Sequence, residues 1–412
     1  MLNKCLGFLL LLSLGIGSAP TLELIHGASF RIVDVLFIIY ILGLAIWLCM
    51  GYRLVNTASI YTAPIFIHLC LLVVMPLLGY IVYTYEVNNI TSSFRFLLIL
   101  VSLVAFWILF MERNNNSYRV FVWALIIGII CNFVLSTLQQ AEFFGLISGD
   151  YLPHYQYEHL VDNPKFYVHA RPVGFFSDPN QLGWYGVLVS MISLGIVMDG
   201  RELRKVGFFG FIFSVLVIAI STSRSAIISF FVGCIVIGAA LSVTKGRSGG
   251  KLIGVFVIIA LSIVWFAFNT EMGRYIARGL SAIVELNLAA DTSFAARSEG
   301  SWIAAIDAFK EYPLGFFGDP TSVSGTIDSN WLSYLVQGSF ILVSSYLVVL
   351  MSAVWRSFQL LKDEAFNGRI AVSVACLGMS VALAVGSVVL SPFHQLHILV
   401  PYIILYMLVA RR

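Results

Sequence analysis

Charged residues are scarce in this chain of 412 residues: they make up 11% of it, against 59% for hydrophobic residues. A soluble protein of this size has about 25% charged residues. Together with the mean hydropathy of +0.93, the shortage of charge excludes a soluble globular protein. Strands of alternating polarity, which mark a membrane β-barrel, are also missing. The apolar runs are about 20 residues long, which is typical of a polytopic, all-α membrane protein.

Several catalytic motifs are absent as well. The chain has no GxxxxGK[ST] phosphate loop, no HExxH, no GxSxG and no GxGxxG. It has no DxD pair for a metal-bound nucleotide, and its expected cytoplasmic loops are too short for a nucleotide site. The six cysteines lie in apolar runs without a CxxC pair, so we interpret them as small hydrophobic residues. We therefore expect no cofactor, no metal and no nucleic-acid partner, and a substrate that supplies its own chemical energy.

The apolar runs predict about twelve transmembrane helices in a single integral membrane domain, residues 1–412. The first run resembles a signal peptide, but the many later runs favour an uncleaved first helix. The boundary between the seventh and eighth runs rests only on Ser221-Thr222-Ser223-Arg224. The predicted spans are 5–22, 32–50, 60–84, 94–111, 119–138, 180–198, 207–222, 224–243, 252–269, 329–354, 370–390 and 393–410.

Lysine and arginine residues predict the orientation of these spans, because they concentrate in short cytoplasmic loops. Placing the N-terminus inside puts the densest clusters, within 201–205 and 245–247, on the cytoplasmic side. Both termini are then cytoplasmic. Two long outer loops follow from this topology, at 139–179 and 270–328, and the second has the spacing of an amphipathic helix near 295–311.

Arginines at the outer ends of spans are the most unusual residues, because an arginine in or beside hydrocarbon is costly and normally paired. They are Arg171, Arg224 and Arg297, with Arg274 and Arg278 less marked. Each alone fits a side chain that reaches the interface or pairs with a carboxylate. Several on one face predict a pyrophosphate cradle for a lipid-linked substrate, because a guanidinium donates two parallel hydrogen bonds to phosphate.

Candidate acids and bases lie in the second outer loop. Asp328 stands where the chain re-enters the membrane, and it is a helix N-cap, a catalytic carboxylate or both. Glu299 is the second candidate, and its place two residues after Arg297 also favours a plain ion pair. Asp307 and Asp319 are weaker candidates.

The first outer loop ends in a segment rich in special residues, Arg171-Pro-Val-Gly-Phe-Phe-Ser-Asp-Pro-Asn-Gln-Leu-Gly183. Its prolines and glycines predict a rigid turn and a close helix approach, and Asp178 or Asn180 predicts a helix cap. His169 precedes it as a further supporting residue. With His154 and His159 it has a spacing open to metal binding, although loop histidines are more often solvated.

This segment resembles the R-P-x-G-x-F-x-(N/D)-P-N-x-L-G signature of the O-antigen polymerase and O-antigen ligase superfamily. Residues 221–226 are similar to the family's T-x-S-R-(G/S)-A segment. Residues 297–302 and 312–318 are similar to its R-x-x-x-W and P-x-x-G-x-G stretch, and 328–338 to its (H/D)-N-x-x-L re-entry. The matches follow the family's order over about 170–340.

The resemblance implies a metal-independent, inverting glycosyltransferase with a GT-C-like helical fold in the bacterial inner membrane, acting at the periplasmic face. Its donor is a glycan on undecaprenyl pyrophosphate, and a chain-length regulator is a further partner that the family implies, besides membrane lipids. Arg171, Arg224 and Arg297 then bind pyrophosphate, and Asp328, or failing that Glu299, positions or deprotonates the acceptor. Aromatic residues such as Tyr155, Tyr157, Trp184 and Trp302 either stack on sugars or pack.

Polymerases of this family extend a surface polysaccharide (O-antigen, capsule or exopolysaccharide) by moving the growing chain onto the next lipid-linked repeat unit. Ligases move the finished chain to lipid A-core, and they usually carry histidine at the position of Asp328. The aspartate favours the polymerase, with the ligase as the first alternative. A lipid-linked glycan transporter or flippase is the alternative from another class, because twelve spans with intramembrane arginines suit it too.

Overall fold

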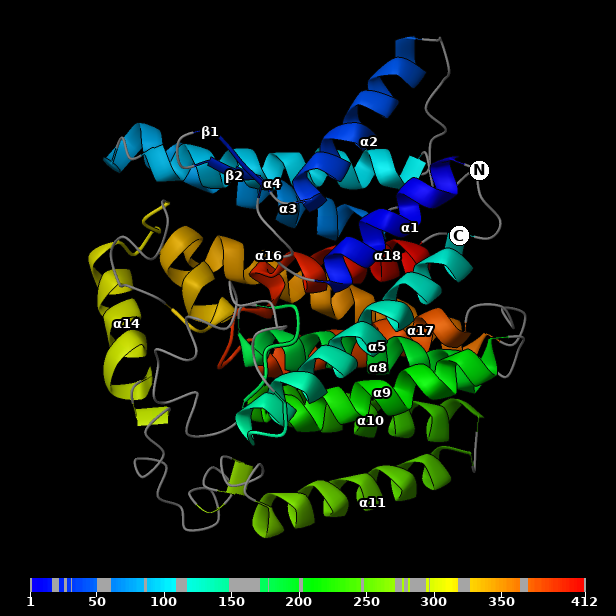
Figure 1. Cartoon of the computed structure of the whole chain (residues 1–412). Helices are drawn as coiled ribbons and strands as arrows, with labels where there is room; N and C mark the ends of the chain where they lie inside the picture. Colours follow the sequence, from blue (N-terminus) through cyan, green and yellow to red (C-terminus); the bar gives the residue numbers. More distant parts are fainter. Residues whose placement is uncertain are drawn as a thin grey trace.

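The computed structural model consists mainly of helices, with one small pair of strands near the N-terminus (Figure 1). The residues that it describes are 2–16, 22–25, 28–30, 32–49, 61–84, 87–108, 117–147, 171–176, 178–199, 203–245, 248–270, 276–277, 281, 294–295, 297–317, 327–363 and 370–410.

The elements of the first half precede the motif that begins at Arg171. They are α1 (Leu2–Gly15), β1 (Leu22–Ile25), β2 (Ala28–Phe30), α2 (Ile32–Cys49), α3 (Ala63–Gly79), the π-helical turn η1 (Tyr80–Thr84), α4 (Val87–Phe106) and α5 (Ser117–Phe143). The two strands pair antiparallel, with Leu22 opposite Phe30. They lie between the first two predicted spans, where no strand was predicted.

The second half contains the helices that carry the motifs. They are α8 (Pro179–Asp199), α9 (Arg204–Ser221), α10 (Arg224–Lys245), α11 (Ser248–Asn269), η5 (Arg297–Ser301), α14 (Trp302–Glu311), α16 (Asn330–Lys362), α17 (Ile370–Gly386), η7 (Pro392–His394) and α18 (Leu396–Ala410). The predicted split between the seventh and eighth spans is confirmed, because α9 ends at Ser221 and α10 begins at Arg224. The helix predicted near 295–311 is also present, as η5 and α14.

The chain is a helical membrane protein. Among the described residues, six helices are long and apolar enough to cross a bilayer: Ala63–Val82, Ser117–Phe143, Pro179–Asp199, Arg204–Ser221, Arg224–Thr244 and Asn330–Lys362. Shorter apolar helices of 10–17 residues lie in the other predicted spans: Cys5–Gly15, Val35–Ile46, Phe96–Phe106, Ile258–Asn269, Ile370–Gly386 and Leu396–Ala410. Every predicted span thus contains an apolar helix, and the total of twelve crossings stays a prediction.

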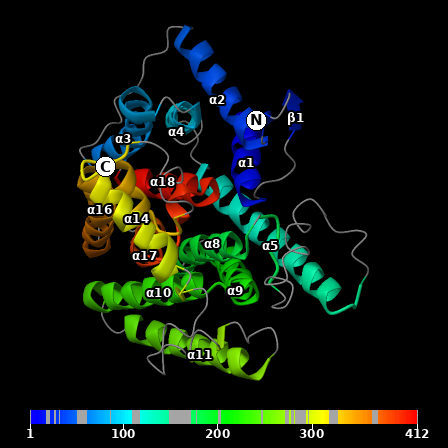
Figure 2. The ribbon, with the colours of Figure 1, turned by 90° about the vertical axis from the view of Figure 1, so that its left-hand side faces the viewer.

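Helix α8 forms the centre of the bundle. It is surrounded by α5, α9, α10 and α17 when the bundle is viewed along its axis (Figure 2). Its side chains are buried along nearly the whole helix, including the large rings of Trp184 and Tyr185. A helix that is apolar on every side can pack against neighbouring helices on all of its faces. The residues that precede α8 are therefore held at a fixed place at one end of the bundle.

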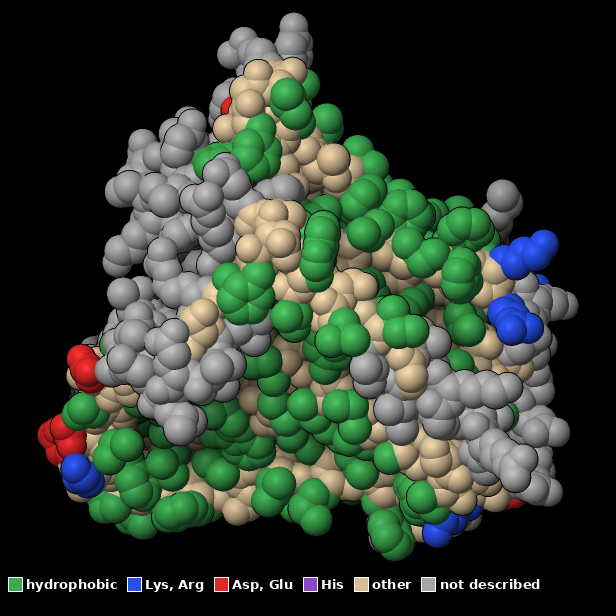
Figure 3. All heavy atoms as spheres, turned by 90° about the horizontal axis from the view of Figure 1, so that it is seen from below, with side chains coloured by type: hydrophobic (Ala, Val, Ile, Leu, Met, Phe, Trp, Pro, Cys, Tyr) green, Lys and Arg blue, Asp and Glu red, His purple; other side chains and the backbone are tan. Residues whose placement is uncertain are grey.

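Charges gather at the two ends of the bundle, and hydrophobic side chains cover the face between them (Figure 3). One end, where α14 lies, carries acidic side chains and a cation, whereas the other end carries mostly Lys and Arg. This distribution is typical of a protein that crosses a bilayer along the bundle axis. The start of α1 and the end of α18 lie at the same side of the view (Figure 1), and the cytoplasmic placement of both termini stays a prediction.

Close backbone contact between α8 and α17 generates a test of this core. A Cβ added at Gly195 would overlap the carbonyl oxygen of Ala371, whereas a Cβ at Gly254, on α11, would meet no atom within 4 Å. We expect Gly195→Ala to lower the free energy of unfolding by about 1–3 kcal/mol, because the helices must separate. Gly254→Ala should be neutral or slightly stabilising, because alanine favours a helix over glycine. Thermal unfolding in detergent measures both, and an equal effect of the two would contradict the packing.

Candidate functional site

The Arg171 segment is held in place by two polar side chains of α5. Gln139 accepts hydrogen bonds from the backbone N–H groups of Val173 (3.0 Å) and Gly174 (2.9 Å) and donates one to the carbonyl of Gly174 (3.2 Å). Asn132 accepts one from the N–H of Phe175 (3.0 Å). Gly174 has φ +59°, and a Cβ there would collide with the side chain of Asn132. The predicted rigid turn is therefore present.

Asp178 caps the start of α8. Its carboxylate accepts a hydrogen bond from the backbone N–H of Asn180, and Pro179 occupies the first helical position. Proline is tolerated there because the N–H of that residue has no partner within the helix. Of the two predicted caps, Asp178 has this role. The side chain of Asn180 is thereby left to contact the neighbouring helices.

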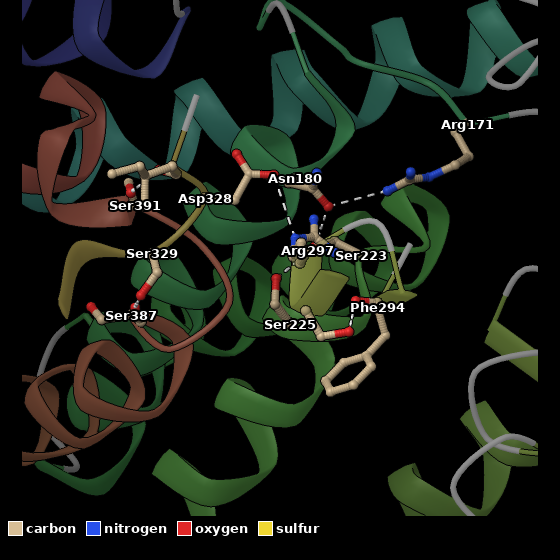
Figure 4. A network of polar contacts seen from close by, with 12 residues as sticks. Arg171, Asn180, Ser223, Ser225, Phe294, Arg297, Asp328, Ser329, Ser387 and Ser391 are labelled. Atoms are coloured by element: carbon tan, nitrogen blue, oxygen red, sulfur yellow. Dashed lines mark hydrogen bonds and ion pairs between the residues drawn. The ribbon is translucent and has the colours of Figure 1, made fainter. Parts of the chain in front are cut away.

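Arg171 is buried, with 8% of its surface exposed, and it is anchored by two acceptors. Its Nε donates to Thr222 Oγ1 at 3.0 Å, and its Nη2 donates to Asn180 Oδ1 at 3.2 Å. The first acceptor belongs to the turn after α9 and the second to the start of α8, and Figure 4 shows the contact between Arg171 and Asn180. The guanidinium therefore joins the segment before α8 and the start of α8 to a turn 51 residues further along the chain.

The turn between α9 and α10 packs directly on the start of α8. Ser223 Oγ donates to Asn180 Oδ1 at 3.0 Å and lies 3.3 Å from Ser225 Oγ. Gly183 allows this approach, because a Cβ there would lie 2.8 Å from both Ser221 Oγ and Ser223 Cβ. The predicted close helix contact is confirmed. Arg224 is half-buried as the first residue of α10, directly beside the serines of this network.

A second arginine, Arg297 of η5, acts on Asp178 at the start of α8, as Arg171 does. Arg297 Nε lies 3.4 Å from Asp328 Oδ2, and the two side chains are 21% and 43% exposed. Figure 4 shows this pair. The ion pair suggested by the closeness of Glu299 to Arg297 in sequence is thus replaced by a pair with Asp328.

The start of α16 is capped by Ser329, not by Asp328. Ser329 Oγ accepts from the backbone N–H of Leu332 at 3.4 Å and donates to the carbonyl of Ser387 at 2.9 Å. Asn330 donates to Ser387 Oγ at 3.1 Å. These bonds fix the start of α16 on the end of α17. The capping alternative for Asp328 is therefore wrong, and its carboxylate is available to Arg297.

Helix α16 is interrupted at Gly338 and Ser339, where the backbone is not helical. The segment after α14 binds this break: the N–H groups of Phe316 and Phe317 donate to the carbonyls of Val336 and Gln337, each at 2.8 Å. Ser339 Oγ donates to the carbonyl of Pro313 at 2.8 Å. Residues 313–317 therefore satisfy the carbonyls at the end of the first part of α16 and tie the Arg297 segment to it.

The remaining predicted site residues have different outcomes. Glu299 is exposed on η5. Trp184 is fully buried in the core, so sugar stacking by this ring is wrong, and Trp302 is half-buried with its ring 5.7 Å from that of Phe294. Asp307 forms an exposed ion pair with Lys310 at 2.8 Å. Several predicted residues lie outside the described part of the chain: His154, Tyr155, Tyr157, His159, His169, Arg274, Arg278 and Asp319.

The residues of α5 and α18 that support the Arg171 segment were not predicted from the sequence. Gln139 and Asn132 anchor its backbone, and His397 packs against Phe176 with ring centres 4.4 Å apart. Buried polar residues within an apolar run are a signal for such a role, because each needs a partner there. Among the described residues, no group of three His, Cys, Asp or Glu side chains is arranged to hold a metal ion.

The electrostatics of the site converge on Asp178. Burial raises its pKa above the ordinary value, and Asp328 acts in the same direction. The N–H of Asn180, Arg171 and Arg297 lower it. Arg171, Arg297 and Asp328 therefore all lie close enough to Asp178 for their charges to affect its ionisation.

Comparison with protein-family models and with curated proteins finds no match for this chain.

The raised pKa of Asp178 predicts how stability depends on pH. Because the folded protein holds the proton more tightly than the unfolded chain, the stability from protonated Asp178 is lost as the pH rises through the folded pKa. An asparagine at this position can still cap α8, but it carries no charge. We therefore expect Asp178→Asn to unfold at a higher temperature than the natural chain at pH 8, and the gap to close as the pH falls toward about 4. A gap that widens on acidification would contradict this assignment.

Proposed function

We propose that this site binds the pyrophosphate of a lipid-linked glycan and transfers the glycan, as a polymerase of a bacterial surface polysaccharide. The observation that carries the proposal is a convergence of helix starts. The starts of α8 and α10 are joined by the Asn180–Ser223 hydrogen bond. At the start of α16, Asp328 pairs with Arg297, and both charges act on Asp178 at the start of α8. Helix N-termini attract anions, because their free N–H groups and aligned dipoles carry partial positive charge.

The arginines add full charges to these dipoles. Arg171 and Arg297 enter the network from two different outer segments, and Arg224 begins α10 within it. A planar guanidinium matches two oxygens of a phosphate at once. A ligand with two linked phosphates therefore matches a site with several arginines better than a ligand with a single carboxylate does. The hydrophobic surface of the bundle supports this choice, because the polyprenyl chain of such a ligand would extend into the lipid beside it (Figure 3).

The proposed reaction is a displacement at the anomeric carbon of the donor sugar. The acceptor hydroxyl forms the new glycosidic bond, the bond to pyrophosphate breaks with its electron pair, and the anomeric configuration inverts. Negative charge develops on the leaving pyrophosphate, where the arginines and helix dipoles stabilise it. Asp328 takes the proton of the acceptor hydroxyl, since its carboxylate lies beside Arg297 at the same site.

The site lies at the bundle end opposite to Arg204, Lys205 and Lys245, which begin α9 and end α10. Cytoplasmic placement of these cations puts the site on the periplasmic face of the inner membrane. Both termini are then cytoplasmic, and twelve spans with a GT-C-like arrangement complete the proposal. A chain-length regulator is a partner of the proposed polymerase.

The arginines are tested by the surface polysaccharide of cells that carry single variants. We expect Arg171→Ala, Arg224→Ala and Arg297→Ala to abolish long chains and leave a single repeat unit on the acceptor. Arg356→Ala is the matched control, because Arg356 lies over the ring of Tyr61, 4.4 Å from its centre, and outside the network. A gel of the polysaccharide shows each result.

Other outcomes of this gel favour the alternatives. Polymer that accumulates on undecaprenyl pyrophosphate without reaching lipid A-core identifies a ligase. Repeat units that remain on the cytoplasmic face identify a flippase. The interrupted α16 is also compatible with a flippase, because transporters often contain broken helices. Normal long chains in correctly folded arginine variants contradict the cradle.

The base is tested by a pair of acidic residues on the same segments. We expect Asp328→Asn to lower the transfer rate by about 100-fold or more, because general-base catalysis contributes about that much. Glu299→Gln should leave the rate close to that of the natural chain, since Glu299 is exposed on η5. Transfer between lipid-linked repeat units, measured with purified protein, gives both rates. A larger loss of transfer rate in Glu299→Gln than in Asp328→Asn would assign the base to Glu299 instead of Asp328.

A further inference from the structure

The residue between α9 and α10 has an unusual backbone conformation. Thr222 has φ 51° and ψ 22°, in the left-handed region, and it closes α9 by donating its N–H to the carbonyl of Ala219 at 3.1 Å. Glycine is the usual residue at such a helix end, because a side chain branched at Cβ is strained there. The side chain of Thr222 is completely buried. Strain of this kind persists where the surrounding structure enforces it, and it clusters at functional sites.

The hydroxyl of Thr222 contacts one edge of the Arg171 guanidinium. Nε donates to Thr222 Oγ1 at 3.0 Å, and Nη2, on the same edge, donates to Asn180 Oδ1 at 3.2 Å. Figure 4 shows the second of these contacts. One acceptor from a turn and one from a helix start hold this edge of the guanidinium at two points. A planar group held in this way loses little freedom when it binds a second pair of oxygens.

We propose that Thr222 is a positioning residue, whose hydroxyl is held by the left-handed turn so that it orients Arg171 toward a prenyl pyrophosphate. The inference rests on the proposed function and adds to it a residue that touches no substrate. Thr222 adds an acceptor at Nε to the one that Asn180 provides at Nη2, and the strained turn holds this acceptor in place.

Three variants of Thr222 separate the hydroxyl from the shape and from the strain. Thr222→Ser keeps the hydroxyl, Thr222→Val keeps the branched shape without it, and Thr222→Gly removes both the hydroxyl and the strain. The probe is farnesyl pyrophosphate, with farnesol as the uncharged control, bound to the purified full-length chain in detergent. We expect the serine variant to bind within about threefold of the natural chain. Valine and glycine should each weaken binding by about tenfold, the effect of one lost hydrogen bond to a charged group.

Thermal unfolding of the same variants distinguishes positioning from a structural role. Glycine adopts the left-handed conformation without strain, so Thr222→Gly should unfold at a higher temperature than Thr222→Val. Binding should nevertheless be weakened equally in both. A structural role would instead make binding follow stability, and the more stable glycine variant would bind better. That result would overturn the proposal.

Arg171→Ala serves as the reference for the proposed function. We expect it to weaken binding, and we expect Thr222→Val to add nothing in the Arg171→Ala background, since both remove the same contact. Normal binding by Thr222→Val, with binding lost in Arg171→Ala, would overturn the role of Thr222 and leave the proposed function standing. Normal binding by Arg171→Ala, or no preference for farnesyl pyrophosphate over farnesol in the natural chain, would overturn the site itself.

Discussion

A single amide oxygen links the parts of this site. Asn180 Oδ1 accepts hydrogen bonds from Arg171 and from Ser223, and so joins the start of α8 to the preceding segment and to the turn before α10. An uncharged acceptor suits this place, because a carboxylate there would neutralise the arginine that it positions. The amide holds the guanidinium without adding a negative charge. The position of Arg171 therefore depends on this oxygen, whereas Arg297 is held by its ion pair with Asp328.

Concentrating positive charge at one end of a membrane bundle has a cost. Arg171 is buried, and helix starts bring further partial positive charge to it. Asp178 and Asp328 offset part of this charge. The remaining attraction for anions is strongest where water is scarce, because charges interact more strongly in a medium of low polarity. Under the proposed function, a bound pyrophosphate would offset the remaining positive charge at this end of the bundle.

Much of the fold follows from the sequence, because apolar runs of membrane length have few alternatives to a helix. The break at 221–224 and the turn at Gly174 were also predictable, since glycine and short polar runs mark such positions. The pairing of Arg297 with Asp328 and the support from Gln139 were not. These contacts join residues far apart in the chain, and local pattern does not specify which segments meet. The cap on α16 shows the same limit at short range, because Asp328 and Ser329 are both good caps and only the contacts with α17 decide between them.

The interruption of α16 also explains how so long a helix fits a bilayer. The helix has 33 residues, and an uninterrupted helix of this size would be about 50 Å long, against about 30 Å for the hydrocarbon core. The part after Ser339 is about 35 Å long and spans that core with a modest tilt. The part before the interruption is therefore not needed to cross the bilayer, and residues 313–317 set its direction. One helix can thus match the membrane thickness with its second part and direct its start toward the site with its first part.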